Sequence, residues 1–257
     1  MKNYIIVLLF LICWPVWGQE KGDAAGDTLR LMSYNIRNGR GMDDATDLRR
    51  VAEAIREARP DVVAVQEVDS ATERSGRVDV SRWLGERVSL YHTYAPAIEF
   101  EGGKYGVAVL SRERPLRAYA KPLPGREEAR VSLWVEFEGY IFCCTHLSLT
   151  EEDRARSLPL LREEAARAGK PVFIAGDWND TPGSPFIRAL GEDFRLLNDT
   201  TRGTYPASAP DRCIDYIAGY AGEGEPFTVL SSEVRDEPLA SDHRPVVVDV
   251  RIGKKAR

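Results

Sequence analysis

Short apolar runs alternate with amphipathic segments along most of the chain, and this pattern predicts a mixed α/β fold. Segment 47–58 carries apolar residues at helical spacing and stops before Pro60, so we expect a helix there. Segment 61–68 (DVVAVQEV) is almost continuously apolar, which is typical of a strand covered on both faces. Further strands are expected at residues 28–36, 106–112, 130–137, 140–149, 171–178, 213–219, 227–234 and 244–252.

Two more helices are expected in the second half of the chain. Residues 150–169 fit the first, in which Thr150 and Asp153 form a variant of the capping box. Pro159 is expected to kink this helix or to delay its start. Residues 184–191 fit a short second helix that begins at a Ser-Pro pair and ends at glycine.

One domain accounts for nearly the whole chain. Residues 28–252 contain no internal repeat, low-complexity tract or second linker. Residues 70–105 and 199–212 are expected to be the variable loops.

The first 18 residues have a different pattern. A basic start, an apolar run of about a dozen residues and a small residue at position 18 are typical of a secretory signal peptide. An uncleaved anchor is the alternative, although the run is short for a membrane span. The sequence therefore predicts a secreted or periplasmic protein with no transmembrane segment in the mature chain. Residues 19–27 are expected to be a flexible leader, and residues 253–257 a basic tail.

The composition fits an ordinary globular domain of 257 residues with an acidic balance. A net charge of -5 argues against binding a polyanion by bulk attraction, but it leaves room for a small basic patch. Three cysteines remain after the signal peptide: Cys143, Cys144 and Cys213. Cys143 and Cys144 are adjacent on an expected strand and point to opposite faces, so we do not expect them to pair with each other. Buried apolar roles fit all three, and the spacing leaves a disulfide involving Cys213 open.

Polar side chains end or interrupt several expected core strands. They are Asn35, Glu67, His146, Asp177, Asn179, Asp215, Asp242 and His243. Each alone fits a turn residue, but the chain has only three histidines and two of them belong to this set. We therefore expect one shared and open site. In the stretch 174–184 (IAGDWNDTPGS), Asp177 and Asn179 are expected to face a ligand, while Asp180 and the Pro-Gly turn shape the loop.

The residue types in this set point to phosphate-ester hydrolysis. Carboxylates and an amide without clustered His or Cys suit Mg²⁺, with Mn²⁺ as an alternative, rather than zinc. A cation neutralises phosphate charge, and a carboxylate or histidine prepares a water for attack. The sequence has no HExxH, GxSxG or GxxxxGK[ST] motif.

Several other residues are weaker candidates for contacts with an anionic substrate, and ordinary surface or packing roles fit them equally well. They are Lys104, Tyr105 and Arg130, together with Arg74 and Arg77 of the first expected loop.

The order of several motifs resembles the endonuclease/exonuclease/phosphatase superfamily, whose fold is that of DNase I. The motifs are SYNIRNG, DVVAVQEVD, YGVAVLSR, CTHLSL, AGDWNDTPGS, IDYIAG and SDHRPVVVDV, and the match as a whole runs from about Leu31 to Val250. The resemblance implies a four-layer α/β sandwich, with two packed mixed β-sheets flanked by helices and the site at one edge. It also implies a metal side, where Glu67 resembles the principal ligand, Asn35 lies close to the metal or phosphate, and Asp242 resembles a second carboxylate.

The same resemblance implies a catalytic side. Asp177 resembles the carboxylate that orients or deprotonates the attacking water, and Asn179 resembles the amide that holds a phosphate oxygen. His243 resembles the histidine beside the scissile phosphate, with Asp215 as its orienting partner. His146 resembles a second histidine found in the DNase-like and phosphatase branches. Whether Asp177 or His243 takes the proton stays open.

We expect, from this resemblance, an exported metal-dependent phosphodiesterase or nuclease. A phosphomonoesterase or lipid-head-group hydrolase, acting on sphingomyelin or inositol phosphates, is the alternative on the same scaffold. A secreted binding domain without catalysis is a third hypothesis. The expected partner is thus a phosphate ester of a nucleic acid, nucleotide, sugar or lipid. No stable protein partner is implied, and a monomer is expected.

Overall fold

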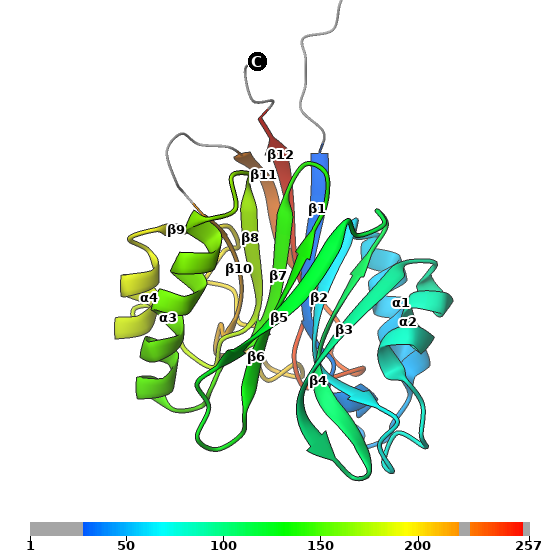
Figure 1. Cartoon of the computed structure of the whole chain (residues 1–257). Helices are drawn as coiled ribbons and strands as arrows, with labels where there is room; N and C mark the ends of the chain where they lie inside the picture. The colour runs from blue at the N-terminus through cyan, green and yellow to red at the C-terminus, as the bar shows by residue number, and fades with distance from the viewer. Residues whose placement is uncertain (1–27, 221–226, 254–257) are drawn as a thin grey trace, which may run out of the picture.

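The computed structural model describes residues 28–220 and 227–253, which fold into two β-sheets packed face to face (Figure 1). Each sheet has six strands within these ranges, in the orders β11-β12-β1-β2-β4-β3 and β5-β6-β7-β8-β10-β9. The strands are β1 (Thr28–Asn35), β2 (Val62–Ser70), β3 (Tyr91–Phe100), β4 (Gly103–Ser111), β5 (Arg117–Leu123), β6 (Arg130–Glu136), β7 (Ile141–His146), β8 (Val172–Asp177), β9 (Phe194–Leu196), β10 (Asp215–Tyr220), β11 (Phe227–Val234) and β12 (Val246–Ile252).

Helices cover the outer face of each sheet. The pair α1 (Leu48–Ala58) and α2 (Val80–Val88) packs on the first sheet, and the pair α3 (Glu151–Ala166) and α4 (Pro185–Leu190) packs on the second. A 3-10 turn, η1 (Arg37–Gly39), follows β1. This arrangement is a four-layer α/β sandwich with two mixed sheets, which confirms the predicted fold class.

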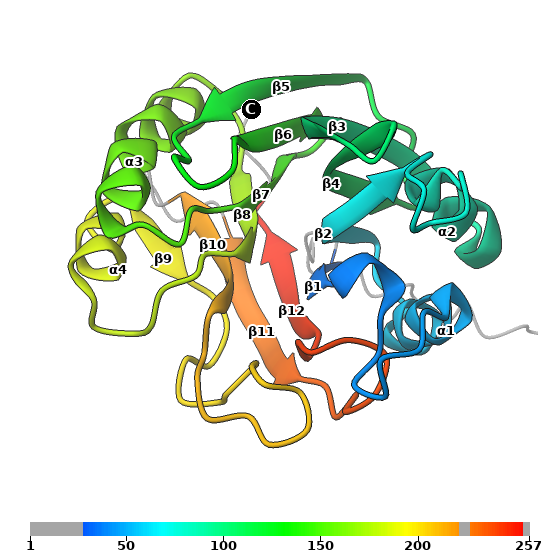
Figure 2. The same ribbon diagram turned by 90° about the horizontal axis from the view of Figure 1, so that it is seen from below.

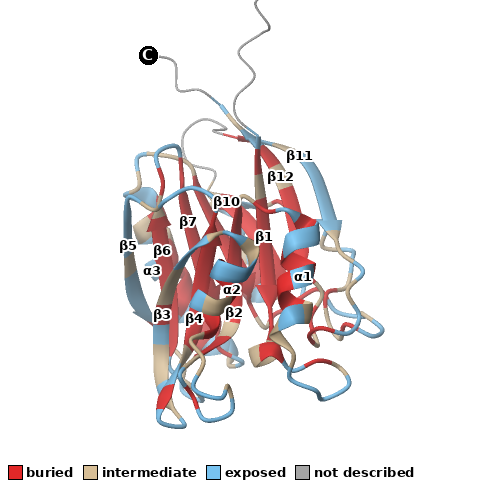
Figure 3. Cartoon of the chain, turned by 90° about the vertical axis from the view of Figure 1, so that its right-hand side faces the viewer, coloured by how far each residue is buried: buried red, intermediate tan, exposed pale blue. Residues whose placement is uncertain are grey.

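The alternation of side chains along the strands builds three apolar layers. Leu31 of β1 lies in the core between the sheets, whereas its neighbour Met32 packs under α1 and α2. Cys144 likewise faces the core between the sheets and Cys143 faces α3, as predicted for adjacent strand residues. Both thiols and Cys213 are buried and free. Figure 3 shows the buried residues concentrated along the strands, while the helices expose their outer sides.

Of the four α-helices within residues 28–220 and 227–253, three start with the caps that their sequences suggest. Asp47 accepts the N–H of Arg49, Asp79 accepts the N–H of Arg82, and the Ser184 hydroxyl accepts the N–H of Ile187. The first and third caps confirm the predicted starts of α1 and α4.

The prediction of a loop at residues 70–105 was wrong. This segment contains α2, β3 and the beginning of β4. β3 is an edge strand with many exposed positions and a register irregularity between Pro96 and Ile98, so it shows no continuous apolar run. The short or exposed edge strands β5 and β9 were missed for the same reason. Residues 199–212 contain no named helix or strand, which confirms the second predicted loop.

The third helix differs from its prediction in its cap and its bounds. Thr150 makes no side-chain capping bond, and its hydroxyl donates to Glu127 Oε2 at 3.3 Å instead. The Asp153 carboxylate is held by the backbone N–H and the guanidinium of Arg126. Pro159 lies inside α3 without ending it or delaying its start, and the helix ends at Ala166 rather than at glycine. The strand expected at residues 140–149 likewise ends earlier, at His146.

The strand directions bring the polar strand ends to one edge of the sandwich. β1 and β2 are parallel, as are β7 and β8, whereas β10 and β12 run antiparallel to β8 and β1. The carboxyl ends of β1, β2, β7 and β8 therefore lie at the same edge as the residues that begin β10 and precede β12. Figure 2 views the molecule from this side.

No helix among the described residues is long and apolar enough to cross a membrane. The predicted signal peptide (1–18), the leader (19–27) and all of the basic tail except Gly253 lie outside the described residues.

Candidate active site

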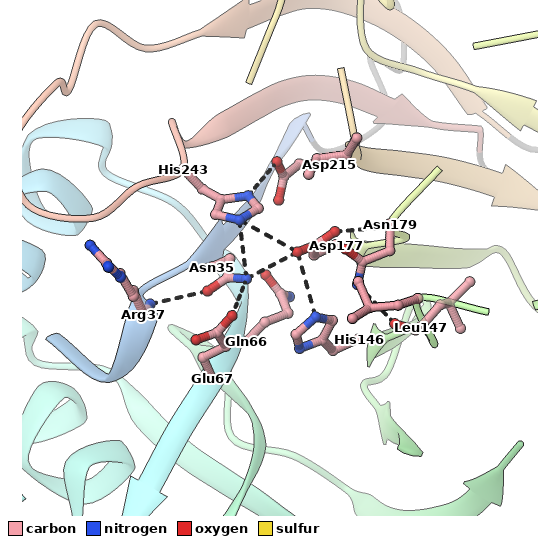
Figure 4. Close-up of polar contacts among 12 residues, drawn as sticks. Asn35, Arg37, Gln66, Glu67, His146, Leu147, Asp177, Asn179, Asp215 and His243 are labelled. Atoms are coloured by element: carbon pink, nitrogen blue, oxygen red, sulfur yellow. Dashed lines mark hydrogen bonds and ion pairs between the residues drawn. The ribbon is translucent and has the colours of Figure 1, made fainter. Parts of the chain in front are cut away.

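The side-chain amide of Asn35, the last residue of β1, lies at the centre of a polar cluster at this edge (Figure 4). Its Nδ2 donates to Glu67 Oε1 at 2.9 Å and to Asp177 Oδ2 at 3.0 Å. Its Oδ1 accepts the backbone N–H of Arg37 at 3.0 Å, and this contact fixes which end of the amide faces the carboxylates. Asn35 therefore links candidate site residues of β1, β2 and β8.

His243 lies between two carboxylates. Its Nδ1 is 2.9 Å from Asp215 Oδ2 and its Nε2 is 3.6 Å from Asp177 Oδ2. Burial alone would lower the pKa of His243, but Asp215 and Asp177 favour the charged ring and raise this pKa to about 10. The ring is therefore an imidazolium at neutral pH, which lets both nitrogens donate hydrogen bonds.

The second histidine, His146, is neutral at neutral pH, in contrast to His243. His146 ends β7, and its Nε2 is 3.5 Å from Asp177 Oδ2. Burial lowers the pKa of His146 to about 4, although Asp177 opposes the shift, so this ring is neutral at neutral pH. Two histidines on one carboxylate therefore hold different protonation states, an arrangement typical of catalytic sites.

The expectation of an open site was wrong for the central residues. Asp177 and His243 are only 2% and 5% exposed. The imidazole is covered by Tyr205, whose ring centroid is 4.9 Å away, and the amide of Asn35 covers Asp177. Truncating either residue to alanine would thus leave buried charges unpaired, so isosteric changes are the better tests.

A β-bulge presents Glu67. The register between β2 and β4 shifts between Val65 and Val68, and Glu67 within this interval has a positive φ of 60°. Positive φ is uncommon for glutamate, and bulges of this kind re-aim side chains beside functional sites. Burial raises the pKa of the Glu67 carboxyl, with the Asn35 hydrogen bond acting in the opposite direction.

The loop after β8 is held by its own polar side chains. The backbone N–H of Asn179 donates to Asp177 Oδ1 and its side-chain Nδ2 donates to the Leu147 carbonyl, both at 2.9 Å. Asn179 has a φ of 51°, a conformation that asparagine tolerates better than most residues. Asp180 accepts from Arg154 Nε at 3.1 Å in a buried ion pair, which confirms its structural role in the loop.

Asp242 lies at the rim of the cluster. Its Oδ2 is 3.6 Å from Arg37 Nε and its Oδ1 is 4.0 Å from His243 Nε2. The structure thus brings all eight predicted site residues to one edge, with Asp242 the most exposed of the carboxylates in the ion pairs around His243. Their individual roles stay predictions.

A model of the Endonuclease/Exonuclease/phosphatase family matches residues 32–243 of the chain. The chain belongs to this family. The uncharacterized protein YbhP of Escherichia coli (strain K12) is 25% identical over 256 residues, with 88% of this chain and 97% of YbhP covered. A crystal structure of an endonuclease/exonuclease/phosphatase from Beutenbergia cavernae superposes with a TM-score of 0.72 at 26% identity, with 88% of this chain and 72% of that chain covered. The Bacteroides thetaiotaomicron mannosyl-6-phosphatase Bt3783 shares the fold, with a TM-score of 0.66 at 17% identity and coverages of 86% and 99%.

Two of the weaker candidates for substrate contacts, Tyr105 and Arg130, line a cavity beside the polar cluster. Tyr105 and Arg130 border a cavity of about 10 Å³ together with His146. The Arg130 side chain is 7% exposed and pairs with Glu127 and Glu128 at 3.4 and 3.0 Å. Its Nε is buried and has no hydrogen-bond partner among the described residues. A single water fits a cavity of this size.

The other weak candidates are occupied elsewhere. Arg74 forms a two-point ion pair with the buried Asp69 and lies 4.5 Å over the Phe100 ring. Lys104 pairs with Glu99, and Arg77 donates to backbone carbonyls. These side chains stabilise the loop and hairpin after β2, so a role in binding an anionic head group has no support from their contacts.

Sequence reasoning missed three residues that position this endonuclease/exonuclease/phosphatase site. The Ser241 hydroxyl donates to the Asn35 carbonyl at 2.7 Å and accepts the His243 N–H at 3.3 Å. Gln66, beside the bulge, is fully buried and donates to Cys144 Sγ at 3.3 Å. Arg37 approaches Asp242. All three belong to the recognised motifs, which was the signal available, but their contacts depend on the packing of the two sheets.

The donor set fits a divalent cation on the Glu67 side. The partly buried Glu67 carboxylate accepts a hydrogen bond from the neutral Asn35 amide and forms no ion pair with another described residue. Ligand atoms of Asp177, Asp215 and His243 also lie within 4.8 Å of one another. The charged His243 ring pairs with Asp215 at 2.9 Å and lies 3.6 Å from Asp177, while Asp215 Oδ1 is buried with no hydrogen-bond partner among the described residues.

Proposed function

We propose that this protein is an exported, divalent-metal-dependent hydrolase of phosphate esters, and that diesters are its preferred substrates. The observation that carries the proposal is the imidazolium of His243 between Asp215 and Asp177, next to the Asn35 amide and the Glu67 carboxylate. One edge thus combines a cationic donor, neutral donors and a carboxylate, which are the groups that phosphoryl transfer to water needs. Membership of the endonuclease/exonuclease/phosphatase family supports the reaction class.

The protonation states of the site residues suit them to different roles in the proposed reaction. Asp177 accepts hydrogen bonds from Asn35 and Asn179 and faces both histidines, so we assign it to orienting the attacking water and taking its proton. His243 carries a proton at neutral pH and is therefore unsuited as a base. We assign it to stabilising the negative charge that develops on the phosphate oxygens, with Asp215 keeping the ring charged and oriented.

Glu67, with Asp242 at the rim, would hold a Mg²⁺ or Mn²⁺ ion, and Asn35 would keep the Glu67 carboxylate in place. Such an ion supplies charge neutralisation for the phosphate and polarises its oxygens. The Nδ2 of Asn179 has a second hydrogen beyond the one donated to Leu147, and this hydrogen is available to a phosphate oxygen.

The assay that tests the proposal compares bis-p-nitrophenyl phosphate with p-nitrophenyl phosphate, each with Mg²⁺ and with EDTA. Metal-dependent cleavage of the diester is the expected result. A preference for the monoester would favour the second candidate, a phosphomonoesterase, to which the fold likeness to Bt3783 draws attention. Cleavage of neither substrate under any metal condition would count against phosphate-ester hydrolysis.

Export is a separate proposal with its own measurement. The basic and apolar pattern of residues 1–18 supports it. Protein recovered from the producing cells should begin near Gln19 by intact mass, and mass spectra that show Met1 retained on the purified protein would contradict export by this signal.

A further inference from the structure

The turn that follows β7 connects two strand ends of the candidate site. It comprises residues 147–150 and begins directly after His146. The Leu147 carbonyl accepts a hydrogen bond from Asn179 Nδ2 at 2.9 Å (Figure 4), and the Leu147 N–H donates to the Asp177 carbonyl at 2.9 Å. Because one amide hydrogen of Asn179 is bound to this carbonyl, the position of the carbonyl sets the direction of the other hydrogen.

Glu127, in the connection between β5 and β6, holds this turn through both of its carboxylate oxygens. Its Oε1 accepts the backbone N–H of Leu149 at 2.8 Å, and its Oε2 accepts the Ser148 hydroxyl at 2.8 Å. The Thr150 hydroxyl also donates to Oε2, at 3.3 Å, and Arg130 pairs with Oε1 at 3.4 Å. One carboxylate therefore accepts hydrogen bonds from three consecutive residues of the turn.

The Glu127 carboxylate carries its charge at neutral pH. Burial alone would raise the pKa of this carboxyl, but its hydrogen bonds and the charge of Arg130 lower the pKa to about 2. Hydrogen bonds to an ionised acceptor are stronger than those between neutral groups. The contacts of Glu127 are therefore well suited to fix the backbone of the turn.

A second charged residue, Arg154 of α3, binds the carbonyls of the same turn. Its Nη1 donates to the Ser148 and Leu149 carbonyls at 3.0 and 2.8 Å, and its Nε pairs with Asp180 at 3.1 Å. A change at Arg154 would thus disturb the turn and the loop after β8 together. The Glu127 side chain contacts the turn and Arg130, so Glu127 is the better residue with which to displace the turn by itself.

We propose that Glu127 is a positioning residue of the site, which fixes the turn after β7 so that the Leu147 carbonyl directs the Asn179 amide at a phosphate oxygen of the substrate. Glu127 acts through Asn179 and not by contact with the substrate. The inference rests on the proposed function, because it needs a substrate phosphate beside Asn179. Glu127 precedes β6 and does not end a core strand, so the strand-end pattern did not point to it.

A double-mutant cycle on the hydrolysis of bis-p-nitrophenyl phosphate tests whether Glu127 acts through Asn179. Glu127→Ala should lower kcat/KM about tenfold, and Asn179→Gly, which removes the amide but tolerates the positive φ, should lower it about 100-fold. In the Asn179→Gly background, Glu127→Ala should change kcat/KM less than about twofold, because the group that it positions is already absent.

The conservative variant Glu127→Gln should keep kcat/KM within about threefold of the wild type, since its side chain retains an oxygen for the Leu149 N–H. Equal losses from Glu127→Ala in both backgrounds would overturn the proposal, because Glu127 would then act through another group such as Arg130. A loss in Glu127→Gln as large as that in Glu127→Ala would also count against it.

NMR tests the same contact without turnover. Heteronuclear correlation spectra compare the Asn179 side-chain amide in the wild type, Glu127→Ala and Glu113→Ala. Glu113 is the matched control, because its carboxylate also accepts a backbone N–H, from Glu138 at 3.1 Å, but lies beyond the end of β4 that pairs with the start of β2. We expect the Asn179 amide resonances to shift in Glu127→Ala and to stay in place in Glu113→Ala.

The two proposals fail in different ways. Unchanged Asn179 resonances in Glu127→Ala would overturn the positioning role, whatever the activity of the wild type. Shifted resonances in a chain whose wild type hydrolyses neither nitrophenyl ester would refute the proposed function alone.

Discussion

Neighbouring charges, rather than residue type, give the two site histidines their different states. Both rings are buried and both face Asp177. His243 has the additional carboxylate of Asp215 on its other nitrogen, and this outweighs the cost of burial. His146 has Arg130 nearby instead, which adds to the effect of burial. The result is one charged and one neutral imidazole on a shared carboxylate.

His146→Gln should make the stability of the protein less sensitive to acid. The folded pKa of His146, about 4, lies below its ordinary value of 6.5. The neutral ring's contribution to stability is therefore complete above pH 6.5 and is lost as the pH falls toward 4. The free energy of unfolding in urea should drop between pH 7 and pH 5 by about 2 kcal/mol more in the wild type than in the variant. The matched control is His92→Gln on the exposed strand β3, and equal pH dependence of the wild type and His146→Gln would contradict the prediction.

Asp215→Asn should lower the pKa of His243, because it removes the strongest of the charges that keep the ring protonated. The raised folded pKa of His243 means that the pair stabilises the protein fully below pH 6.5 and that this contribution is lost as the pH rises toward 10. NMR titration of the His243 ring should show no deprotonation below pH 8 in the wild type and a midpoint at lower pH in the variant. Phosphodiester kcat/KM should fall by about 100-fold or more. Identical titration midpoints would show that Asp215 does not set the charge of the ring.

At the scale of elements, the site depends on segments that local sequence preference would not choose. The bulge in β2 holds Glu67 at a positive φ, and the loop after β8 holds Asn179 at another. Such conformations cost free energy and persist only when the surrounding packing determines them. In the second case, the buried pair of Arg154 in α3 and Asp180 supplies part of that packing.

Removing either partner of this pair should destabilise the protein by about 3 kcal/mol, because the remaining charge stays buried and unpaired. Arg154→Leu, Asp180→Leu and the double variant complete a double-mutant cycle in urea unfolding, and the double variant should lose less stability than the sum of the single changes. The exposed pair of Arg82 and Glu86 in α2 is the control, where Arg82→Ala should cost less than about 1 kcal/mol. Additive losses at Arg154 and Asp180 would show that the pair does not couple.

For the whole molecule, the sequence was sufficient to predict the fold class and to indicate the eight polar side chains that the structure brings to one edge. Continuous apolar runs indicated the positions of the central strands. The polar residues at the ends of these strands lie at one edge because the direction and register of strand pairing place those ends side by side. The edge strands β3, β5 and β9 were not predicted, because half-exposed strands lack a continuous run of apolar residues. The packing of Tyr205 on His243 and the orientation of the Asn35 amide were also not predicted, because both depend on contacts between residues far apart in the chain.

The most direct test of the proposed site is the steady-state kinetics of Asp177→Asn on bis-p-nitrophenyl phosphate, with Mg²⁺ added back after EDTA treatment. The substitution keeps the volume of the side chain and removes its charge, so the fold should be retained, as a thermal unfolding curve can verify. The control is Asp43→Asn, at a surface carboxylate that pairs with Arg50. We expect metal-dependent turnover in the wild type and the control, and a kcat/KM at least about 100-fold lower for Asp177→Asn. Wild-type turnover by a folded Asp177→Asn protein would contradict the assignment of this edge as the active site.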